Sequence, residues 1–271
     1  MTGALGVALA VALAGCGGGT EDPDAGTNGV GKLSAAKIEA KARAAADSAG
    51  TVRLLGSVVS QGRTYKLDMR LAADGGRGEV SSEAATFQLL RVGQALYLKA
   101  DAGFWAREKD DRPTAGGTAA PSGRATGTST AASKLDGKYV KVPASDPVYK
   151  RFRGFTDKDV LLSSLLGLRG ELTTGDRGTF DGTRTIRLSA GRGAGGTLDV
   201  SLEGKPYPLR LQRAGGGGVV QLTDWGGSVD LRVPDAAQVV DYGQQVGTGS
   251  GTGTGPGGDS SPGGASSPGG S

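Results

Sequence analysis

The side chains that most often catalyse reactions are scarce in this chain of 271 residues. It has no histidine and one cysteine, Cys16, which excludes Ser-His-Asp and Cys-His catalysis, histidine metal sites and an intrachain disulfide. Carboxylate pairs occur at Asp110–Asp111 and at Asp157 with Asp159. The first pair lies in a low-complexity segment and the second opens an expected helix, where carboxylates favour the helix dipole. We therefore predict no catalytic residue, no metal site and no cofactor.

Phosphate and nucleic-acid binding are not indicated either. The glycine run at 215–218 joins two expected strands and lacks the lysine and the helix of a P-loop. The 31 basic and 27 acidic residues leave a formal net charge of only +4, and the basic residues are spread along the chain without interleaved aromatics. We expect a solvated surface of mixed charge and no nucleic-acid partner.

The single cysteine has a chemical role as a lipid acceptor. Residues 3–14 form an uncharged apolar run of signal-peptide length, too short to cross a bilayer as a helix. The run ends in Leu13-Ala14-Gly15-Cys16, which resembles the lipobox of bacterial prolipoproteins: small residues let the peptidase reach the bond before Cys16, and the thiol accepts a diacylglyceryl group. Two acyl chains give a stable anchor. We expect a signal peptide at 1–15 and a lipid-anchored protein on the extracytoplasmic face of the cell membrane.

The segments that follow predict a tether and a helix. Residues 16–31 have no apolar period, which is typical of a flexible tether behind the lipidated Cys16. Residues 33–48 are rich in Ala, Lys and Glu and are followed by Gly50, which predicts a helix. Its apolar stripe consists of Ile38, Ala42, Ala45 and Ala49. Because these side chains are small, the helix should pack closely against a flat surface.

From residue 51 onward the hydrophobic period is two, which predicts strands. Polar and apolar residues alternate cleanly at 64–71, 198–203 and 229–233, and less strictly elsewhere. The looser segments are 51–59, 85–92, 94–99, 138–142, 183–189, 207–213 and 219–223. No helices of crossover length separate them, so we predict an antiparallel meander of about ten strands with one wet and one apolar face.

One further helix and two unstructured segments complete the expected domain. Residues 156–168 predict a helix capped by Thr156, and most of its sides are apolar, so it should be buried or lie over a cavity. Residues 110–137 have the composition of a disordered insert, and residues 243–271 that of a disordered Gly-, Ser- and Pro-rich tail. The foldable part, residues 32–242, suits one domain.

The order of several local motifs resembles one family. Gln94-Ala95-Leu96-Tyr97-Leu98 followed by Phe104-Trp105 looks like that family's strand, turn and tryptophan, and residues 180–188 (FDGTRTIRL) look like its "DGxxTIR" strand. Residues 207–211 (YPLRL) and 222–226 (LTDWG) resemble its last strands. With the lipobox, these motifs make residues 33–234 similar to the LppX/LprG-type actinobacterial lipoproteins, within the wider LolA-like group.

The resemblance implies the fold and a function. It implies an α+β protein with a single open, strongly curved antiparallel half-barrel, helices against the concave face, and an apolar cavity for acylated lipids or glycolipids. A monomer is expected. The side chains that we expect to line the cavity are Val58, Met69, Leu89, Leu98, Leu161, Leu165, Ile186 and Val200.

Two functions from different classes remain open at this point. In the first, the lipoprotein binds and transfers lipids in the cell envelope. In the second, it is a non-enzymatic sensor or scaffold that binds an envelope protein partner, as LolA-like domains also do in stress regulators. Side chains would fill the concave face in the second case, so the occluded volume discriminates between the two. An enzyme is the weakest of the alternatives.

Overall fold

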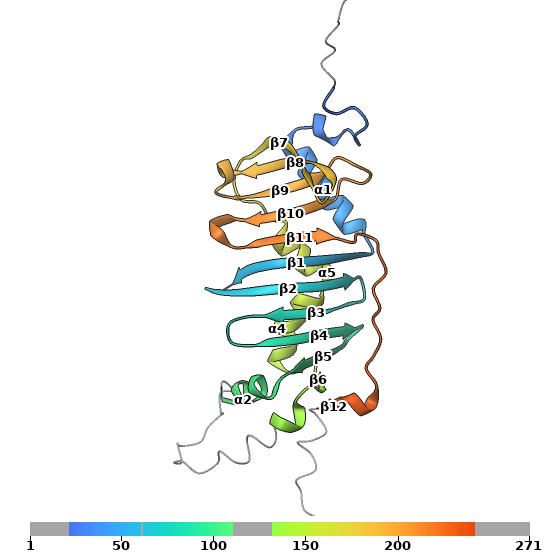
Figure 1. The fold of residues 1–271 in the computed structure, drawn as a ribbon, viewed down its shortest axis with the longest axis vertical. Helices are drawn as coiled ribbons and strands as arrows, with labels where there is room; N and C mark the ends of the chain where they lie inside the picture. Colours follow the sequence, from blue (N-terminus) through green and yellow to red (C-terminus); the bar gives the residue numbers. More distant parts are fainter. Residues whose placement is uncertain (1–21, 61, 111–131, 242–271) are drawn as a thin grey trace, which may run out of the picture. The chain divides into compact units, whose positions relative to one another are not determined.

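The structure is a computed structural model that describes residues 22–60, 62–110 and 132–241. The fold class predicted from the sequence, an α+β protein built on an open, curved antiparallel sheet, is confirmed, with twelve strands instead of about ten (Figure 1). The chain divides into two compact units. Unit 1 comprises the chain up to Ala73 with Lys158–Ser228, and unit 2 comprises Asp74–Asp157 with the chain from Val229 onward.

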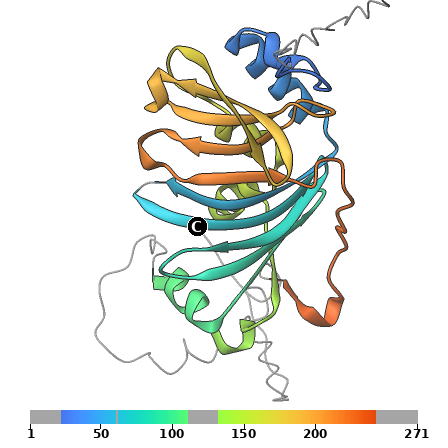
Figure 2. The ribbon, with the colours of Figure 1, turned by 45° about the horizontal axis from the view of Figure 1, so that its top comes forward.

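Unit 1 holds seven antiparallel strands in the order β2-β1-β11-β10-β9-β8-β7. The pairing of β1 with β11 joins the early hairpin to the later meander. Helices α1 (Ala35–Ser48) and α5 (Lys158–Leu165) lie on one side of this sheet (Figures 1 and 2). The strands are β1 (Thr51–Ser60), β2 (Arg63–Ala72), β7 (Leu172–Phe180), β8 (Thr183–Ala190), β9 (Gly196–Ser201), β10 (Pro208–Arg213) and β11 (Val219–Thr223).

Unit 2 holds five strands in the order β12-β6-β5-β4-β3. All pairs are antiparallel except β12 with β6, which is parallel because the chain returns to this edge from far along the sequence. The strands are β3 (Gly75–Ser81), β4 (Thr86–Val92), β5 (Ala95–Ala100), β6 (Tyr139–Val142) and β12 (Val239–Asp241). Its helices include α2 (Ala102–Asp110) and α4 (Pro147–Thr156).

Helix α4 covers the apolar face of unit 2. It begins at Pro147 after the cap Asp146, whose carboxylate accepts from the Val148 amide at 2.9 Å. Its buried Phe152 packs edge-on against Phe87 of β4, with ring centroids 4.8 Å apart. Aromatic side chains therefore fill the space between this helix and its sheet.

The buried guanidinium of Arg91 closes the carboxyl end of α4. It donates from Nη2 to the Thr156 carbonyl at 2.9 Å, from Nε to the Thr156 hydroxyl at 3.2 Å, and from Nη1 to the Gly93 carbonyl at 2.9 Å. The Asp157 carboxylate lies 4.0 Å away. Because each of these acceptors is a helix-end or turn group that needs a donor, Arg91 stabilises the helix end and the β4–β5 turn together.

The outer face of unit 1 carries cross-strand ion pairs. Arg53 of β1 binds Asp68 of β2 through two hydrogen bonds of 3.0 and 2.8 Å, and Arg187 of β8 binds Asp199 of β9 in the same way at 2.7 and 3.1 Å. The hydrogen bond from Arg53 holds the pKa of Asp68 below its ordinary value. The opposite face of the same strands is apolar.

The lowered pKa of Asp68 predicts a pH-dependent contribution to stability. Because the folded pKa lies below the ordinary value of 3.8, the pair stabilises the fold above that value and loses its effect as the pH falls through the folded pKa. Asp68→Asn should therefore lower the free energy of unfolding slightly at neutral pH and not at all in stronger acid. Urea unfolding of both proteins across this range measures it, and a difference that does not change with pH would contradict the prediction.

Several expected elements differ in the structure. Strands β3, β7 and β12 were not predicted, and residues 229–233 form no strand although they alternate. The helix expected at 156–168 begins at Lys158, because Thr156 ends α4 and binds Arg91 instead of capping α5. The helix expected at 33–48 is confirmed as α1.

The parts of the chain beyond the fold are only partly described. The expected signal peptide, Cys16 and the expected tail at 243–271 lie outside the described residues, as does most of the expected insert at 110–137. Its last residues pack on unit 2: the Asp136 carboxylate accepts from the Ala102 amide at 3.1 Å, and the Gly137 amide donates to the Ala100 carbonyl at 3.2 Å. The low-complexity composition therefore does not extend to the end of the expected insert.

Candidate functional site

The apolar side of the unit 1 sheet is the candidate site, and we call it the inner face. Residues directly opposite each other across antiparallel strands point to the same side, and the pairing places buried apolar residues in register from β2 to β8. The face comprises Val52, Leu54, Val58, Leu67, Met69, Leu71, Ile186, Leu188, Leu198, Val200, Leu211, Val220 and Leu222. Six adjacent strands thus present one continuous apolar surface.

The cover over this face is made of two helices with different side chains. Helix α1 buries one branched residue, Ile38, in a stripe that otherwise consists of alanines. Helix α5 buries leucines on one side, among them Leu161 and Leu165. Since an alanine buries little more than one methyl group, α1 contributes much less apolar area per turn than α5 does.

Polar contacts join the two helices to each other. Arg43 of α1 donates to the Leu166 carbonyl at 2.5 Å and is also paired with Glu39 at 3.0 Å. Lys158 of α5 is buried, and its ammonium reaches the Asp47 carbonyl at 3.4 Å and the Asp159 carboxylate at 2.7 Å. These contacts hold the ends of α5 to α1, so the helices form one cover.

The residues predicted to line a cavity are all buried, but they divide between the two units. Val58, Met69, Leu161, Leu165, Ile186 and Val200 belong to unit 1, and Leu89 and Leu98 face each other across β4 and β5 in unit 2. Met69, Ile186 and Val200 are completely buried, whereas Val58 and Leu161 each keep 8% of their surface exposed. Access to the inner face is therefore greater at Val58 and Leu161 than at Ile186.

Other inner-face residues were not singled out from the sequence. Leu54 and Leu222 are directly paired across β1 and β11, and Leu188 and Leu198 across β8 and β9. All four side chains are completely buried. The period-two alternation that located Met69 and Val200 also contains these positions, so the signal was present in the sequence.

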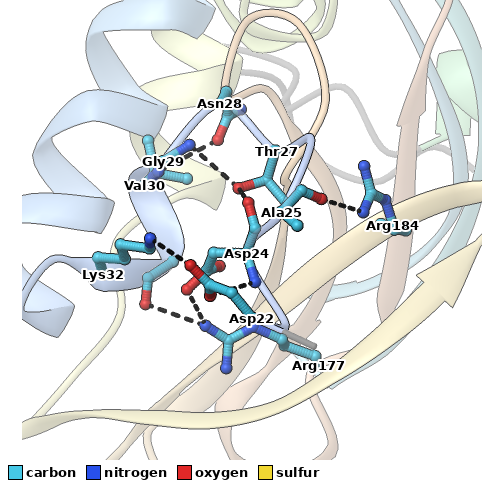
Figure 3. A network of polar contacts seen from close by, with 11 residues as sticks. Asp22, Asp24, Ala25, Thr27, Asn28, Gly29, Val30, Lys32, Arg177 and Arg184 are labelled. Carbon is cyan, nitrogen blue, oxygen red and sulfur yellow. Dashed lines mark hydrogen bonds and ion pairs between the residues drawn. The ribbon is translucent and has the colours of Figure 1, made fainter. Parts of the chain in front are cut away.

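An ordered segment at residues 22–31, which we call the clasp, is bound to the edge of unit 1 (Figure 3). The Asn28 amide donates to the Leu202 carbonyl at 2.8 Å, and its side chain donates to the Ser201 and Gly204 carbonyls. Arg184 of β8 donates to the carbonyls of Ala25 and Gly26. The flexible tether predicted for 16–31 is thus wrong for these residues, because distant arginines and strand carbonyls satisfy the polar groups of the clasp.

An ion pair between a buried carboxylate and a partly exposed arginine fixes the same segment. The side chain of Asp24 is 5% exposed and binds Arg177 of β7 at 2.6 Å. Gly31 passes so close that a Cβ there would lie 2.4 Å from the second Asp24 carboxylate oxygen. A side chain at 31 would therefore force the Asp24 carboxylate to shift. At the neighbouring turn, the amide and guanidinium of Arg184 hold the pKa of Glu203 below its ordinary value.

The described residues offer little other chemistry. They contain no group of three or more His, Cys, Asp or Glu side chains that could hold a metal ion. None of the helices among them is both long and apolar enough to span a membrane. The feature that distinguishes this fold is the apolar inner face under its two helices, which defines a class of α+β proteins with an open antiparallel sheet and a helical cover.

The comparisons with known proteins give similar structures only. No protein-family model matches the chain, and no curated protein matches it in sequence. LprF from Mycobacterium bovis is similar with a TM-score of 0.49 and 16% identity, over 74% of this chain and 96% of LprF. The Mycobacterium tuberculosis lipoprotein LppX has a TM-score of 0.40 and 12% identity, over 73% of this chain and 99% of LppX. The second of these proteins, LppX, is one of the two that give their names to the family that the sequence motifs resemble.

Proposed function

We propose that the chain is a lipoprotein that binds acylated lipids or glycolipids between the inner face of unit 1 and its helical cover, and transfers them within the cell envelope. The observation that carries this proposal is the mismatch between the two sides. The sheet presents large apolar side chains over six strands, whereas α1, which packs near β7 and β10, buries only alanines and Ile38. Because α1 has so few large side chains, it can be separated from the sheet at a small cost.

The energetics favour an acyl chain as the ligand. Lifting α1 exposes mainly alanine methyl groups and the sheet residues beneath them, at about 25 cal/mol per Å² of apolar surface. An acyl chain can replace that contact without a polar partner, because each CH₂ group that it buries contributes about 0.8 kcal/mol. Because the chain leaves one apolar environment for another, the transfer from a bilayer needs no covalent step, and no catalytic group is assigned.

The anchor belongs to the same proposal. Cys16 lies outside the described residues, and its role is supported by the apolar run and the small residues before it. Acyl chains on Cys16 would keep the protein on the extracytoplasmic face of the membrane that contains its ligands. The reach of this anchor is set by the residues between Cys16 and the clasp.

Lipid retention tests the proposal. The chain from residue 17 onward is exported behind an ordinary cleavable signal peptide in a lipid-rich actinobacterial host, so that no acyl chain is attached to it, and its native mass is measured together with extracted lipids. Bound diacyl or triacyl species are expected. Leu161→Phe with Leu165→Phe should reduce the lipid recovered by most of its amount, since the larger rings fill the space beside the inner face.

A matched control separates filling from general disturbance. Val160→Phe places the same ring on α5 at a position that is 54% exposed, so it should leave the recovered lipid unchanged. A ligand-free mass for the unsubstituted chain would refute lipid binding and would favour a sensor or scaffold that binds a protein partner. The mass of the complete lipoprotein, with and without Cys16→Ser, reports the acyl anchor separately.

A further inference from the structure

The ordered clasp shortens the connection between the lipid anchor and the folded chain. Only residues 17–21 separate Cys16 from Asp22, the first described residue of the clasp. Six residue steps span at most about 20 Å when fully extended. Had the whole segment from Cys16 to α1 been free, nineteen steps would have spanned about 65 Å. The point at which the chain leaves unit 1 is therefore held close to an anchored membrane surface.

The strand register determines which end of unit 1 lies at that point. The clasp contacts the turn between β9 and β10, through the carbonyls of Leu202 and Gly204, and the start of β8, through Arg184. These contacts all lie at one end of the strands, which we call the clasp end. The opposite end of β8 carries the turn with the exposed Arg192. The eight residues of β8 separate the two ends by about 25 Å.

A pair of aromatic side chains lies at the clasp end. Tyr207 closes the β9–β10 turn, where its carbonyl accepts from the Ser201 amide at 2.9 Å. Trp225 follows β11 and stacks on Tyr207, with ring centroids 4.8 Å apart and planes 2° from parallel. Its indole N–H donates to the Pro208 carbonyl at 3.2 Å, and both rings remain partly exposed. Amphipathic rings of this kind favour the membrane–water interface, where one part is apolar and the other wet.

From the short reach and the aromatic pair, we infer that the clasp end of unit 1 is a membrane-contact surface and that Tyr207 and Trp225 lie at the headgroup level of the bilayer. The partner is the lipid surface that carries the anchor, so the inference rests on the proposed acylation of Cys16. The clasp acts as a positioning segment, because it converts a long tether into a short one. The strands of unit 1 then lead away from the membrane, and the far end lies outside the headgroup layer.

Tryptophan quenching tests the orientation. The chain has two tryptophans, so Trp105→Phe leaves Trp225 as the only one, and adding Trp225→Phe with Arg192→Trp moves the only tryptophan to the far end. Each mature chain from Cys16 is coupled through that thiol to a maleimide lipid in phosphatidylglycerol–phosphatidylethanolamine vesicles that contain a headgroup nitroxide lipid. Trp225 is expected to lose most of its fluorescence and the far-end tryptophan almost none. Equal quenching, or stronger quenching at the far end, would overturn the inference.

Variants of the clasp test its part in the orientation. Asn28→Ala with Arg184→Ala removes four hydrogen bonds between the clasp and the sheet and should reduce the quenching of Trp225 to the far-end value. Lys32→Ala removes only the exposed ion pair with Asp22 and should leave the quenching unchanged. Because the thiol is coupled chemically, failure of this orientation is distinct from failure of acylation, which the mass of the complete lipoprotein reports.

Discussion

Arg91→Met should lower the free energy of unfolding of unit 2 by about 2–4 kcal/mol, because it leaves buried carbonyls without donors. The methionine keeps the length and apolar stem of the side chain, so the change is mainly the loss of the guanidinium. The carbonyls of Thr156 and Gly93 then lack the hydrogen bonds that now measure 2.9 Å each. The variant no longer has to bury a charge, and this gain offsets part of the lost stability. The net decrease in the free energy of unfolding should therefore not exceed about 4 kcal/mol.

Urea unfolding measures this effect when Trp105 is the only fluorophore. Trp105 is buried in α2 of unit 2, so a Trp225→Phe background reports on the correct unit. Arg153→Met is the matched control, since Arg153 is 47% exposed and its ion pair with Asp157 is 3.9 Å long. It should cost no more than about 0.5 kcal/mol. Similar losses for the two variants would show that the buried contacts of Arg91 contribute little.

A conservative variant separates charge from geometry. Arg91→Lys keeps the positive charge, but an ammonium cannot reach the helix end and the β4–β5 turn at the same time. We expect it to lose most of the same free energy of unfolding. Full stability with lysine would mean that the charge near Asp157, and not the planar set of donors, stabilises the end of α4.

The strands were predictable where one face is buried and the other is wet. In β2 the alternation places Leu67, Met69 and Leu71 on one side, and all three are buried in the structure. In β7 no such signal exists, because this edge strand is exposed on both faces and contains Gly175 and Gly178. Polar and apolar residues alternate because one face of a strand is buried, so the alternation is missing where an edge strand buries neither face.

One segment that alternates was wrongly predicted to be a strand. Residues 229–233 alternate as cleanly as β2 but form no strand. The contact from Arg77 of β3 to the Asp230 carbonyl at 3.4 Å is made by a side chain and is not strand pairing. Pairing depends on a free neighbouring edge, which a local sequence pattern does not contain. Helix α4 was missed for a different reason: its signals, Asp146 followed by Pro147, were present and unused.

The sequence was enough to predict which side chains of the candidate site are buried, but not how these side chains are arranged relative to one another. The period of two indicated which strand residues face inward, and the six predicted lining residues on strands are buried, as are Leu161 and Leu165 of α5. Their division between two units depends on contacts between distant segments. The clasp left no sequence signal, because its partners Arg177 and Arg184 lie about 150 positions away and its own Gly, Asp and Thr residues are typical of a linker. Long-range polar contacts of this kind are not encoded in local composition.

The attachment of α1 to the inner face should depend on Ile38. Ile38 is completely buried and is the only branched side chain in the stripe, so Ile38→Ala should lower the free energy of unfolding of unit 1 by about 2–5 kcal/mol. The same change should speed amide hydrogen exchange across α1 more than across β1 or β11. Lys37→Ala is the control, since this neighbouring side chain is exposed and its loss should leave both quantities nearly unchanged.

The same variant shows whether α1 can move independently of the sheet. If α1 is the movable part of the cover, Ile38→Ala should also release a bound fluorescent fatty acid faster, because opening needs less apolar contact to be broken. The contacts of Arg43 and Lys158 with the other helix remain in this variant, so α5 could limit how far α1 separates. Exchange that rises equally in α1 and in the strands would instead mean that the cover and sheet open only together. A lipid would then have to enter beside Val58 and Leu161, where the structure retains its small exposure.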